Sequence, residues 1–240
     1  MQNSLNEDRI AELKRQQQAL ATQVRVLRLE PFLAPSDLLL ALDIQYEGDQ
    51  AFVGAALQSW DNTLKKQFAY ATRTDMPYYP GLFCFREGPP LQEFIKALRS
   101  YDSRLMPRLV LVDGQGLAHP RGFGVACWLG LTSGIATLGC AKSSLLPYTG
   151  ELAQEAGSTL GVYLNARQVG TVLRRKTGIN PVFVSVGHGV NLRQAEEVLM
   201  GLPSDYRLPD LLREADQNAR ALAKQELPAS VLNLTAHHIS

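Results

Sequence analysis

The sequence predicts an α/β protein in which a mixed central sheet carries helices on both faces. Three observations support this prediction. Apolar runs of strand length recur along the chain, and several of them alternate with segments whose apolar residues are spaced like one face of a helix. The first three strand-like runs are separated only by short turns, which indicates antiparallel hairpins. The later runs are separated by helical segments, a pattern typical of layered α/β sheets.

Length and composition are ordinary for a globular protein. The chain has 240 residues, of which 45% are hydrophobic and 20% are charged, and we expect one domain over residues 1–240. No apolar run approaches the roughly 18 residues that cross a bilayer. The polar N-terminus lacks a signal-peptide core, and Cys84, Cys127 and Cys140 form no C-x-x-C pair. We therefore expect a cytoplasmic protein with reduced, buried thiols and no membrane partner.

Basic residues are concentrated in the middle third of the chain. Residues 114–195 contain seven Lys or Arg against two Asp or Glu, although the net charge of the whole chain is only +1. A nucleic-acid backbone is bound by a local basic surface rather than by global charge. The charge alone leaves two interpretations open, a polyanion-binding surface and a solvated surface that happens to be basic.

The N-terminal half is predicted to contain a helix, a three-strand hairpin sheet and a second helix. The first strand is apolar on both faces, so it belongs near the centre of the sheet. Two prolines stiffen the loop before the second helix. The predicted elements are a helix near residues 5–27 within an N-terminal extension of residues 1–30, strands over 38–46, 51–60 and 67–72, the rigid loop 76–81, and a helix over 91–101.

The C-terminal half continues with alternating strands and helices. The strand that begins at residue 107 delivers Asp113 to a glycine-rich turn, and Pro209 suits the start of the last helix. The predicted elements are strands over 107–113 and 135–138, a helix after residue 119, a hairpin of strands 161–168 and 171–174, a strand over 181–186, helices over 191–200 and 210–225, and a flexible tail over 228–240.

Two aspartates stand out because they occur in otherwise apolar strands. Asp43 interrupts the first strand, and Asp113 ends the strand that begins at residue 107. A buried carboxylate is unfavourable unless it is paired or binds a cation, and two on neighbouring strands would repel each other. Hard oxygen ligands of this kind favour magnesium. For Asp113 the alternative is that it merely caps the helix that follows.

Four further residues could complete a hydrolytic site. Glu87 follows the rigid loop, and Asp216 lies on the inner turn of the last helix if that helix buries its apolar face. Three or four such carboxylates can support metal-assisted phosphodiester hydrolysis. His119 and Lys142 would supply nearby proton-donating or cationic groups. Taken singly, Glu87 could be a loop residue, Asp216 an exposed helix acid and His119 a core histidine.

The order of several multi-residue blocks closely resembles the endonuclease V family, over about residues 38–220. These blocks are Asp43, Pro77-Tyr78-Tyr79-Pro80-Gly81, Phe85-Arg86-Glu87-Gly88-Pro89, the run from Val112 to Arg121, Ala141-Lys142, Val184-Ser185-Val186-Gly187-His188 and Tyr206-Arg207-Leu208-Pro209. Long blocks in the right order are far more specific than a single short motif.

The resemblance implies a ribonuclease H-like fold and a magnesium-dependent endonuclease, with Mn²⁺ expected to substitute. Such an enzyme recognises deoxyinosine and other deaminated bases in DNA. It cuts the second phosphodiester on the 3′ side of the lesion and leaves 3′-hydroxyl and 5′-phosphate ends. It also implies that Asp43 and Asp113 are the principal metal ligands, that Glu87 is the third acid, and that His119 and Lys142 lie near the scissile phosphate.

The resemblance also implies a wedge and a lesion pocket. Tyr78 lies in the family's wedge loop, where Pro77 and Pro80 brace it, and an aromatic ring suits a place that a base has left. The matching pocket residues are Gly81, Leu82, Gly114 and Gly139. The chain departs from the pattern at Gln115, where many relatives have histidine, and at Asp216, where some relatives have histidine.

Two other functions compete with DNA repair. The first is an inosine-specific endoribonuclease or a structure-selective nuclease on the same metal core, because discrimination of ribose depends on contacts to the 2′-hydroxyl. The second is a binding module without activity, against which the intact Asp43, Glu87 and Asp113 argue. The expected partners are deoxyinosine-containing DNA and, under the first alternative, inosine-containing RNA. No obligate protein partner is inferred.

Overall fold

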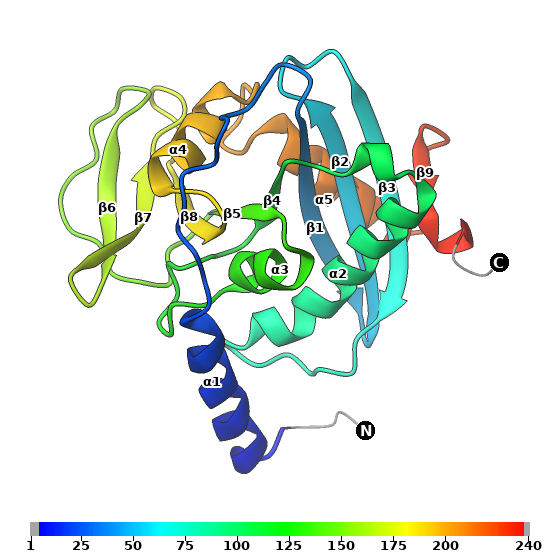
Figure 1. Cartoon of the computed structure of the whole chain (residues 1–240), viewed down its shortest axis with the longest axis horizontal. Coiled ribbons are helices and arrows are strands. Elements are labelled where there is room, and N and C mark those ends of the chain that lie inside the picture. Colours follow the sequence, from blue (N-terminus) through cyan, green and yellow to red (C-terminus); the bar gives the residue numbers. More distant parts are fainter. Residues whose placement is uncertain (1–4, 238–240) are drawn as a thin grey trace.

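A computed structural model describes residues 5–237 and contains a nine-stranded mixed sheet with helices on both faces (Figure 1). The strand order is β6-β7-β8-β5-β4-β1-β2-β3-β9. The expected fold class is therefore confirmed. The strands are β1 (Leu38–Glu47), β2 (Gln50–Ser59), β3 (Lys65–Arg73), β4 (Leu109–Asp113), β5 (Ala136–Ala141), β6 (Thr159–Leu164), β7 (Arg167–Leu173), β8 (Val182–His188) and β9 (Val231–Asn233). The α-helices are α1 (Glu7–Ala21), α2 (Phe83–Tyr101), α3 (Val125–Ser133), α4 (Leu192–Gly201) and α5 (Asp210–Ala223).

The hairpin start and the central position of β1 are confirmed. Strands β1, β2 and β3 pair antiparallel, and the other edge of β1 pairs parallel with β4. The turn between β1 and β2 contains Gly48 at φ +62°, a conformation that glycine adopts without strain. Because β1 lies between two partners and under helices, both of its faces must be apolar, as the sequence shows.

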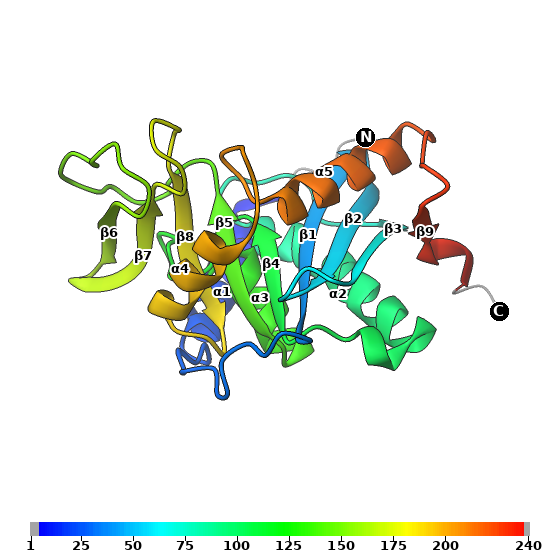
Figure 2. The same cartoon turned by 90° about the horizontal axis from the view of Figure 1, so that it is seen from above.

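Helices cover the two faces of the sheet separately. Helix α5 packs on β1 and β2, whereas α2 and α3 lie on the opposite face (Figure 2). Alternate residues of β1 supply the two cores, since side chains along a strand point to opposite faces. Leu40 and Leu42 join the core under α2 and α3, and Leu39 and Ala41 join the core under α5.

The close approach of α5 to the sheet depends on Gly54. A Cβ atom at this position of β2 would lie 2.0 Å from the carbonyl oxygen of Ala215 and 2.3 Å from the backbone nitrogen of Ala219. No side chain fits between backbones at that distance. Gly54 is the register partner of Asp43, so the glycine brings α5 directly over the strand that carries this acid.

Helix α2 begins at Phe83, eight residues before the predicted start at residue 91. Proline normally disrupts a helix interior because it lacks an N–H and leaves the carbonyl four residues earlier without its partner. Here Pro90 leaves the carbonyl of Arg86 free, and that oxygen accepts from Thr74 Oγ1 at 3.2 Å and from Tyr46 Oη at 3.3 Å. Tertiary hydrogen bonds replace the missing helical one, so the helix continues through the prolines.

Three other element boundaries differ from the prediction. Helix α1 ends at Ala21, several residues before the expected end. The turn of the β6–β7 hairpin falls at Asn165 and Ala166, both at positive φ, rather than near residue 169. Residues 231–233, expected within a flexible tail, instead form β9, which pairs parallel with β3 at the sheet edge.

Other expectations from composition have mixed outcomes. Cys84, Cys127 and Cys140 are free thiols and buried, as expected. No helix within residues 5–237 is long and apolar enough to cross a membrane. Arg174 and Arg175 in the basic middle third are each 6% exposed and bond backbone carbonyls, so part of that charge holds loops together instead of facing solvent.

Candidate active site

Asp43 and Asp113 lie side by side in the centre of the sheet. Leu42 of β1 is the register partner of Val112 of β4, and the two aspartates are the residues that follow in each strand. Asp113 is the last residue of β4, and the N-cap of the following helix α3 is Gly124. The interpretation of Asp113 as a helix cap is therefore wrong. Asp43 is held by a hydrogen bond of 2.8 Å from the backbone N–H of Ile44 to its Oδ1.

Helices from opposite faces add two more carboxylates to this pair. Glu87 comes from α2, whose extra N-terminal turns place it on a helix instead of the expected loop. Asp216 comes from α5, and its charge is among the causes that raise the pKa of Asp43. We call Asp43, Glu87, Asp113 and Asp216 the acid cluster.

Burial and neighbouring charges disfavour the ionisation of three acids of this cluster, Asp43, Glu87 and Asp113. Burial, and then the charge of Asp113, raises the pKa of Asp43 to about 8. Burial, and then the charges of Asp43 and Asp113, raises the pKa of Glu87 to about 8. Burial also raises the pKa of Asp113, although the charge of Lys142 opposes the shift. Like charges in a desolvated site favour the neutral forms, and a cation among them would reverse the shifts.

Two members of the cluster already have a cationic partner. Lys142, just beyond β5, lies with its Nζ 3.7 Å from Asp113 Oδ2. Asp216 accepts at Oδ1 from Arg220 Nε at 2.8 Å and from Gln45 Nε2 at 3.3 Å. Asp43 and Glu87 have no such ion pair among the described residues.

The donor set suits a hard divalent cation, but it is not a preformed cage. All four acids offer carboxylate oxygens, the ligands that Mg²⁺ prefers. Among the residues that the structure describes, no three Asp, Glu, His or Cys side chains converge closely enough to hold a metal ion. The register of β1 and β4 nevertheless places Asp43 and Asp113 at neighbouring positions of adjacent strands. The carboxylate oxygens therefore suit Mg²⁺, and the side chains would have to move closer together to coordinate it.

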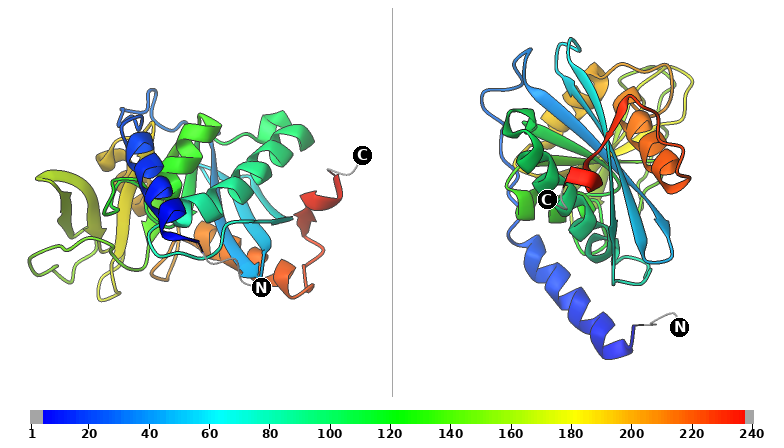
Figure 3. Two further views of the ribbon diagram at one scale, coloured as in Figure 1. Left: turned by 90° about the horizontal axis from the view of Figure 1, so that it is seen from below. Right: turned by 90° about the vertical axis from the view of Figure 1, so that its right-hand side faces the viewer.

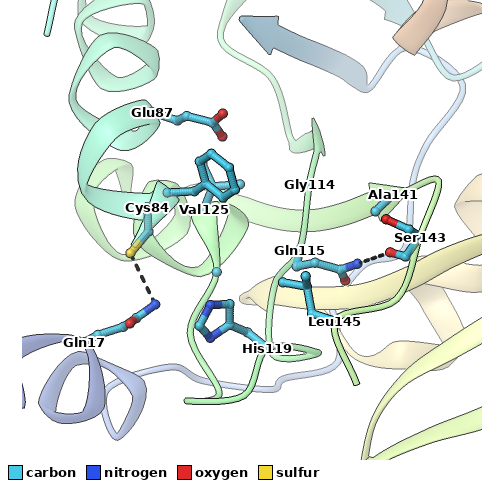
Figure 4. A pocket seen from close by; sticks show the side chains of 12 residues that line it. Gln17, Cys84, Glu87, Gly114, Gln115, His119, Val125, Ala141, Ser143 and Leu145 are labelled. Atoms are coloured by element: carbon cyan, nitrogen blue, oxygen red, sulfur yellow. Dashed lines mark hydrogen bonds between the residues drawn. The ribbon is translucent and has the colours of Figure 1, made fainter. Parts of the chain in front are cut away.

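A pocket adjoins the acid cluster (Figure 4). It has a volume of about 170 Å³, and Figure 4 shows Glu87 on one side and Gln17 with His119 on the other. The lining residues are Gln17, Phe83, Cys84, Glu87, Gly114, Gln115, His119, Gly124, Val125, Ala141, Ser143 and Leu145. Asp113 and Lys142 are the direct chain neighbours of lining residues, so the cavity opens beside the acids.

The predicted pocket residues divide into one wall and three supports. Gly114 lines the pocket, at a φ of +151° that glycine tolerates. Gly139 lies beneath the turn after Asp113, since its Cβ would meet the Gly114 carbonyl oxygen at 2.5 Å. Leu82 is buried at 1% exposure, and Gly81 turns its carbonyl toward other side chains. These three lie outside the lining of this cavity, and their part in a lesion pocket stays a prediction.

His119 is buried at the wall of the pocket, with both ring nitrogens hydrogen-bonded. Its Nδ1 accepts from the backbone N–H of Arg121 at 3.1 Å, and its Nε2 therefore donates to the carbonyl of Gly81 at 3.1 Å. Burial, and then the charge of Arg121, lowers the pKa of His119 to about 4. The imidazole is thus neutral and hydrogen-bonded at both nitrogens, which fits a role in positioning better than one in proton transfer.

The aromatic loop before α2 presents one ring to solvent. Tyr78 is 63% exposed, and its ring packs edge-on against Phe83 of the pocket wall at 5.0 Å between centroids. Tyr79 is partly buried, with Lys14 of α1 over its ring. The flanking Pro77 and Pro80 restrict the backbone of this loop, residues 77–81. Of the two tyrosines, Tyr78 is the one placed at the rim of the pocket.

A shallow second groove begins at Lys142. Its volume is about 500 Å³, and it is lined by Lys142, Ser143, Ser144, Leu146, Pro147, Tyr148, Asn180, Pro181, Phe183 and Arg207. The ring of Tyr148 is 43% exposed and packs on Phe183 with 5.6 Å between centroids. Two basic residues and an exposed aromatic ring are the side chains that single-stranded nucleic acid contacts.

Sequence reasoning missed the residues that act through long-range contacts. Gln17 of α1 lines the pocket, and it was not among the site residues expected from the sequence. Gln115 bonds the carbonyl of Ser143 at 2.8 Å and so ties the glycine-rich turn to the loop after Lys142. The partners of Gln17, Gly81 and Phe123, lie 64 and 106 residues along the chain, so no local pattern indicates them.

Known proteins provide an independent comparison. The family model described as Endonuclease V matches residues 18–217. Endonuclease V of Geotalea uraniireducens is 37% identical over 220 residues, which are 91% of this chain and 90% of that protein. The catalytic domain of human Endonuclease V superposes with a TM-score of 0.83 at 26% identity, covering 93% of this chain and 100% of that one.

A further structure is that of Ciona intestinalis Endonuclease V in complex with a 24mer DNA containing an inosine followed by a ribo-adenosine. Its TM-score is 0.78 at 22% identity, and the match covers 91% of this chain and 99% of that one. At this identity the likeness concerns the fold alone. Together with the human structure it confirms the ribonuclease H-like fold expected from the sequence.

Proposed function

The chain belongs to the endonuclease V family, and from this premise we propose that it is a metal-dependent endonuclease acting on deoxyinosine in DNA. It hydrolyses the second phosphodiester on the 3′ side of the lesion and leaves 3′-hydroxyl and 5′-phosphate ends. The observation that carries the proposal is the acid cluster beside a pocket with a glycine wall. A pure binding module has no use for buried acids that raise one another's pKa.

Magnesium is the proposed cofactor, with Mn²⁺ substituting for it. Asp43 and Asp113 would be the principal ligands, with Glu87 as the third acid. Asp216 is the weakest candidate, because its charge is already paired with Arg220. When bound, the cation would activate water and stabilise the leaving oxygen. Lys142, 3.7 Å from Asp113, adds a positive charge at the place where the substrate phosphate would come to lie.

The pocket is proposed to receive the deaminated base. An engineered cavity of about 150 Å³ binds benzene, so a cavity of about 170 Å³ beside the acids has room for a flipped base. A base outside the stack can be recognised only in such a pocket. Tyr78, exposed at the rim, would stack in the gap that the base leaves. His119 would support the pocket wall rather than transfer a proton.

The decisive experiment offers three substrates side by side with Mg²⁺: a duplex with one deoxyinosine, an inosine-containing RNA and an undamaged branched duplex. We expect the deoxyinosine duplex to be nicked fastest. End-labelled products should map the cut to the second phosphodiester on the 3′ side, and a chelator should abolish it. Preference for the RNA would support the ribonuclease alternative. Binding of the lesion without any cut in Mg²⁺ or Mn²⁺ would contradict the proposal.

A further inference from the structure

The carbonyl oxygen of Gly81 accepts hydrogen bonds from three side chains that lie far from it in the sequence. Arg121 Nη2 lies at 2.5 Å, His119 Nε2 at 3.1 Å and Gln17 Nε2 at 3.2 Å. We call these three side chains around that oxygen the Gly81 clamp. Gly81 ends the aromatic loop, and α2 begins two residues later at Phe83. The clamp therefore fixes the junction between the loop and the helix that lines the pocket.

Gln17 is the member of the clamp that comes from the N-terminal helix. Figure 3 shows the N-terminal end of α1 projecting from the body of the protein, whereas Leu13 and Gln17 farther along the helix are buried. Gln17 is 0% exposed, although its neighbours Gln16 and Gln18 are exposed. Its Nε2 also donates to the Phe123 carbonyl at 2.6 Å, and its Oε1 accepts from Arg121 Nε at 2.5 Å. Both ends of the buried amide are thus engaged, as burial requires.

The backbone at Gly81 leaves no room for another arrangement. Its φ of +79° favours glycine, and an added Cβ would lie 2.6 Å from Arg121 Nη2. The next amide, at Leu82, donates to the carbonyl of Tyr79 at 3.1 Å, so the orientation of this one residue is coupled to the turn of the loop. Releasing the Gly81 carbonyl would let the loop move relative to Phe83, on which Tyr78 packs.

We propose that Gln17 is a positioning residue for lesion recognition, which makes the N-terminal helix part of the recognition apparatus. By holding the Gly81 carbonyl, it keeps Tyr78 and the pocket wall in one arrangement before the substrate arrives. Such preorganisation strengthens binding because less freedom is lost in the complex. No hydrogen bond joins Gln17 to the acid cluster in the described part of the chain, so its effect should fall more on binding than on the hydrolytic step. The proposal rests on the deoxyinosine function proposed above.

The test replaces Gln17 by methionine, which keeps the length of the side chain and removes its hydrogen bonds. Gln18→Met is the matched control, because it makes the same substitution at a neighbouring residue that is exposed. With a chelator present to prevent cutting, we expect Gln17→Met to weaken binding of the deoxyinosine duplex about tenfold, as loss of a charge-supported hydrogen bond does. Binding of the undamaged duplex should change much less, the nicking rate at saturating protein should fall less than the affinity, and the control should match the wild type.

Amide hydrogen exchange measures the rigidity of the loop held by the clamp, and it needs no substrate. Amides of residues 78–84 should exchange faster in Gln17→Met than in the wild type or in Gln18→Met, while β4 and β5 keep their protection. If Gln17→Met does not fold, Arg121→Lys provides a second way to loosen the same carbonyl. Lysine keeps the charge but cannot bond Gln17 and Gly81 at once as the guanidinium does.

The outcomes separate the inference from the proposed function. A wild type without preference for deoxyinosine would defeat the proposed function, and the exchange rates would still judge the clamp. A wild type that prefers deoxyinosine together with a Gln17→Met variant of equal preference and equal exchange would overturn the inference. An equal loss of affinity for both duplexes would also overturn it, because a residue that only anchors the helix predicts that result.

Discussion

The acid cluster and the Gly81 clamp lie on two sides of one pocket and are built on opposite principles. The cluster places Asp43 and Glu87 on regular elements and gives neither of them a cationic partner among the described residues. The clamp holds an irregular loop, and its buried amide and imidazole are satisfied at both ends. The acid cluster thus lies on regular elements in an electrostatically unfavourable arrangement, whereas the proline-restricted loop at the clamp is held by satisfied hydrogen bonds.

Stability and function conflict at the acid cluster but not at the Gly81 clamp. Buried like charges destabilise a fold. The acids of the cluster therefore lower stability, and we attribute their presence to the proposed function. Hydrogen bonds that close a loop stabilise it and also preorganise it for a ligand. Substitutions on the two sides of the pocket should therefore have opposite effects on stability. Removing an acid should stabilise the protein, and removing a clamp residue should not.

The largest expected effect follows from Asp113→Asn. The amide keeps the size of the side chain and removes the charge that would hold a metal ion, so nicking of a deoxyinosine duplex should fall at least about a thousandfold. In metal-free buffer the same variant should melt at a higher temperature than the wild type, because Asp43 and Glu87 lose a repelling neighbour. Nicking rates and a thermal melt check both points. A variant that is inactive and less stable than the wild type would contradict the expectation that removing an acid stabilises the protein.

A metal-dependent change of stability with pH should come next in size. The pKa of Asp43 is raised from 3.8 to about 8 on folding, so the folded state binds more protons than the unfolded state between these values. The contribution of Asp43 to stability is therefore fully present below about pH 4 and is lost as the pH rises through about 8. His119 acts in the opposite direction, since its pKa is lowered to about 4, but only below its ordinary value of 6.5.

Melting between about pH 7 and 9 separates the two contributions, since His119 is neutral in both states there. We expect the metal-free melting temperature to fall across this window and Mg²⁺ to raise it more at the higher pH, because the ligands must lose protons to bind. Asp43→Asn should flatten the metal-free curve. A curve that rises with pH in the wild type would show that the acids are not coupled.

The sequence located the acids but not the surroundings that control them. Asp43 and Asp113 were evident because a carboxylate in an apolar strand is conspicuous locally. Gln17 was not, since its partner Gly81 lies 64 residues away and nothing near Gln17 reports that contact. The first turns of α2 were missed for a related reason. Local rules for Pro89 and Pro90 end a helix, and only the tertiary bonds to the Arg86 carbonyl restore it.

Tyr78→Ala should have an intermediate effect, on binding. Stacking of one base on an aromatic ring contributes roughly 1 to 3 kcal/mol, so affinity for the deoxyinosine duplex should fall about tenfold to a hundredfold. Tyr79→Ala is the matched control, because its ring is partly buried beside Lys14. The pH dependence of melting should not change in either variant. If both tyrosines weaken binding equally, Tyr78 has no special role as the wedge.

The smallest effect should follow from His119→Gln, and it decides to which side of the pocket this residue belongs. A glutamine can still donate from its Nε2 to the Gly81 carbonyl, so a positioning residue should lose at most about tenfold in nicking rate. The pH profile should keep its shape, since the imidazole is already neutral with its pKa near 4. A loss as large as that of Asp113→Asn, with an altered acidic limb, would instead place His119 in the chemistry. In that case His119 would act with the acid cluster, and the proposed division between the acid cluster for catalysis and the Gly81 clamp for recognition would not hold for His119.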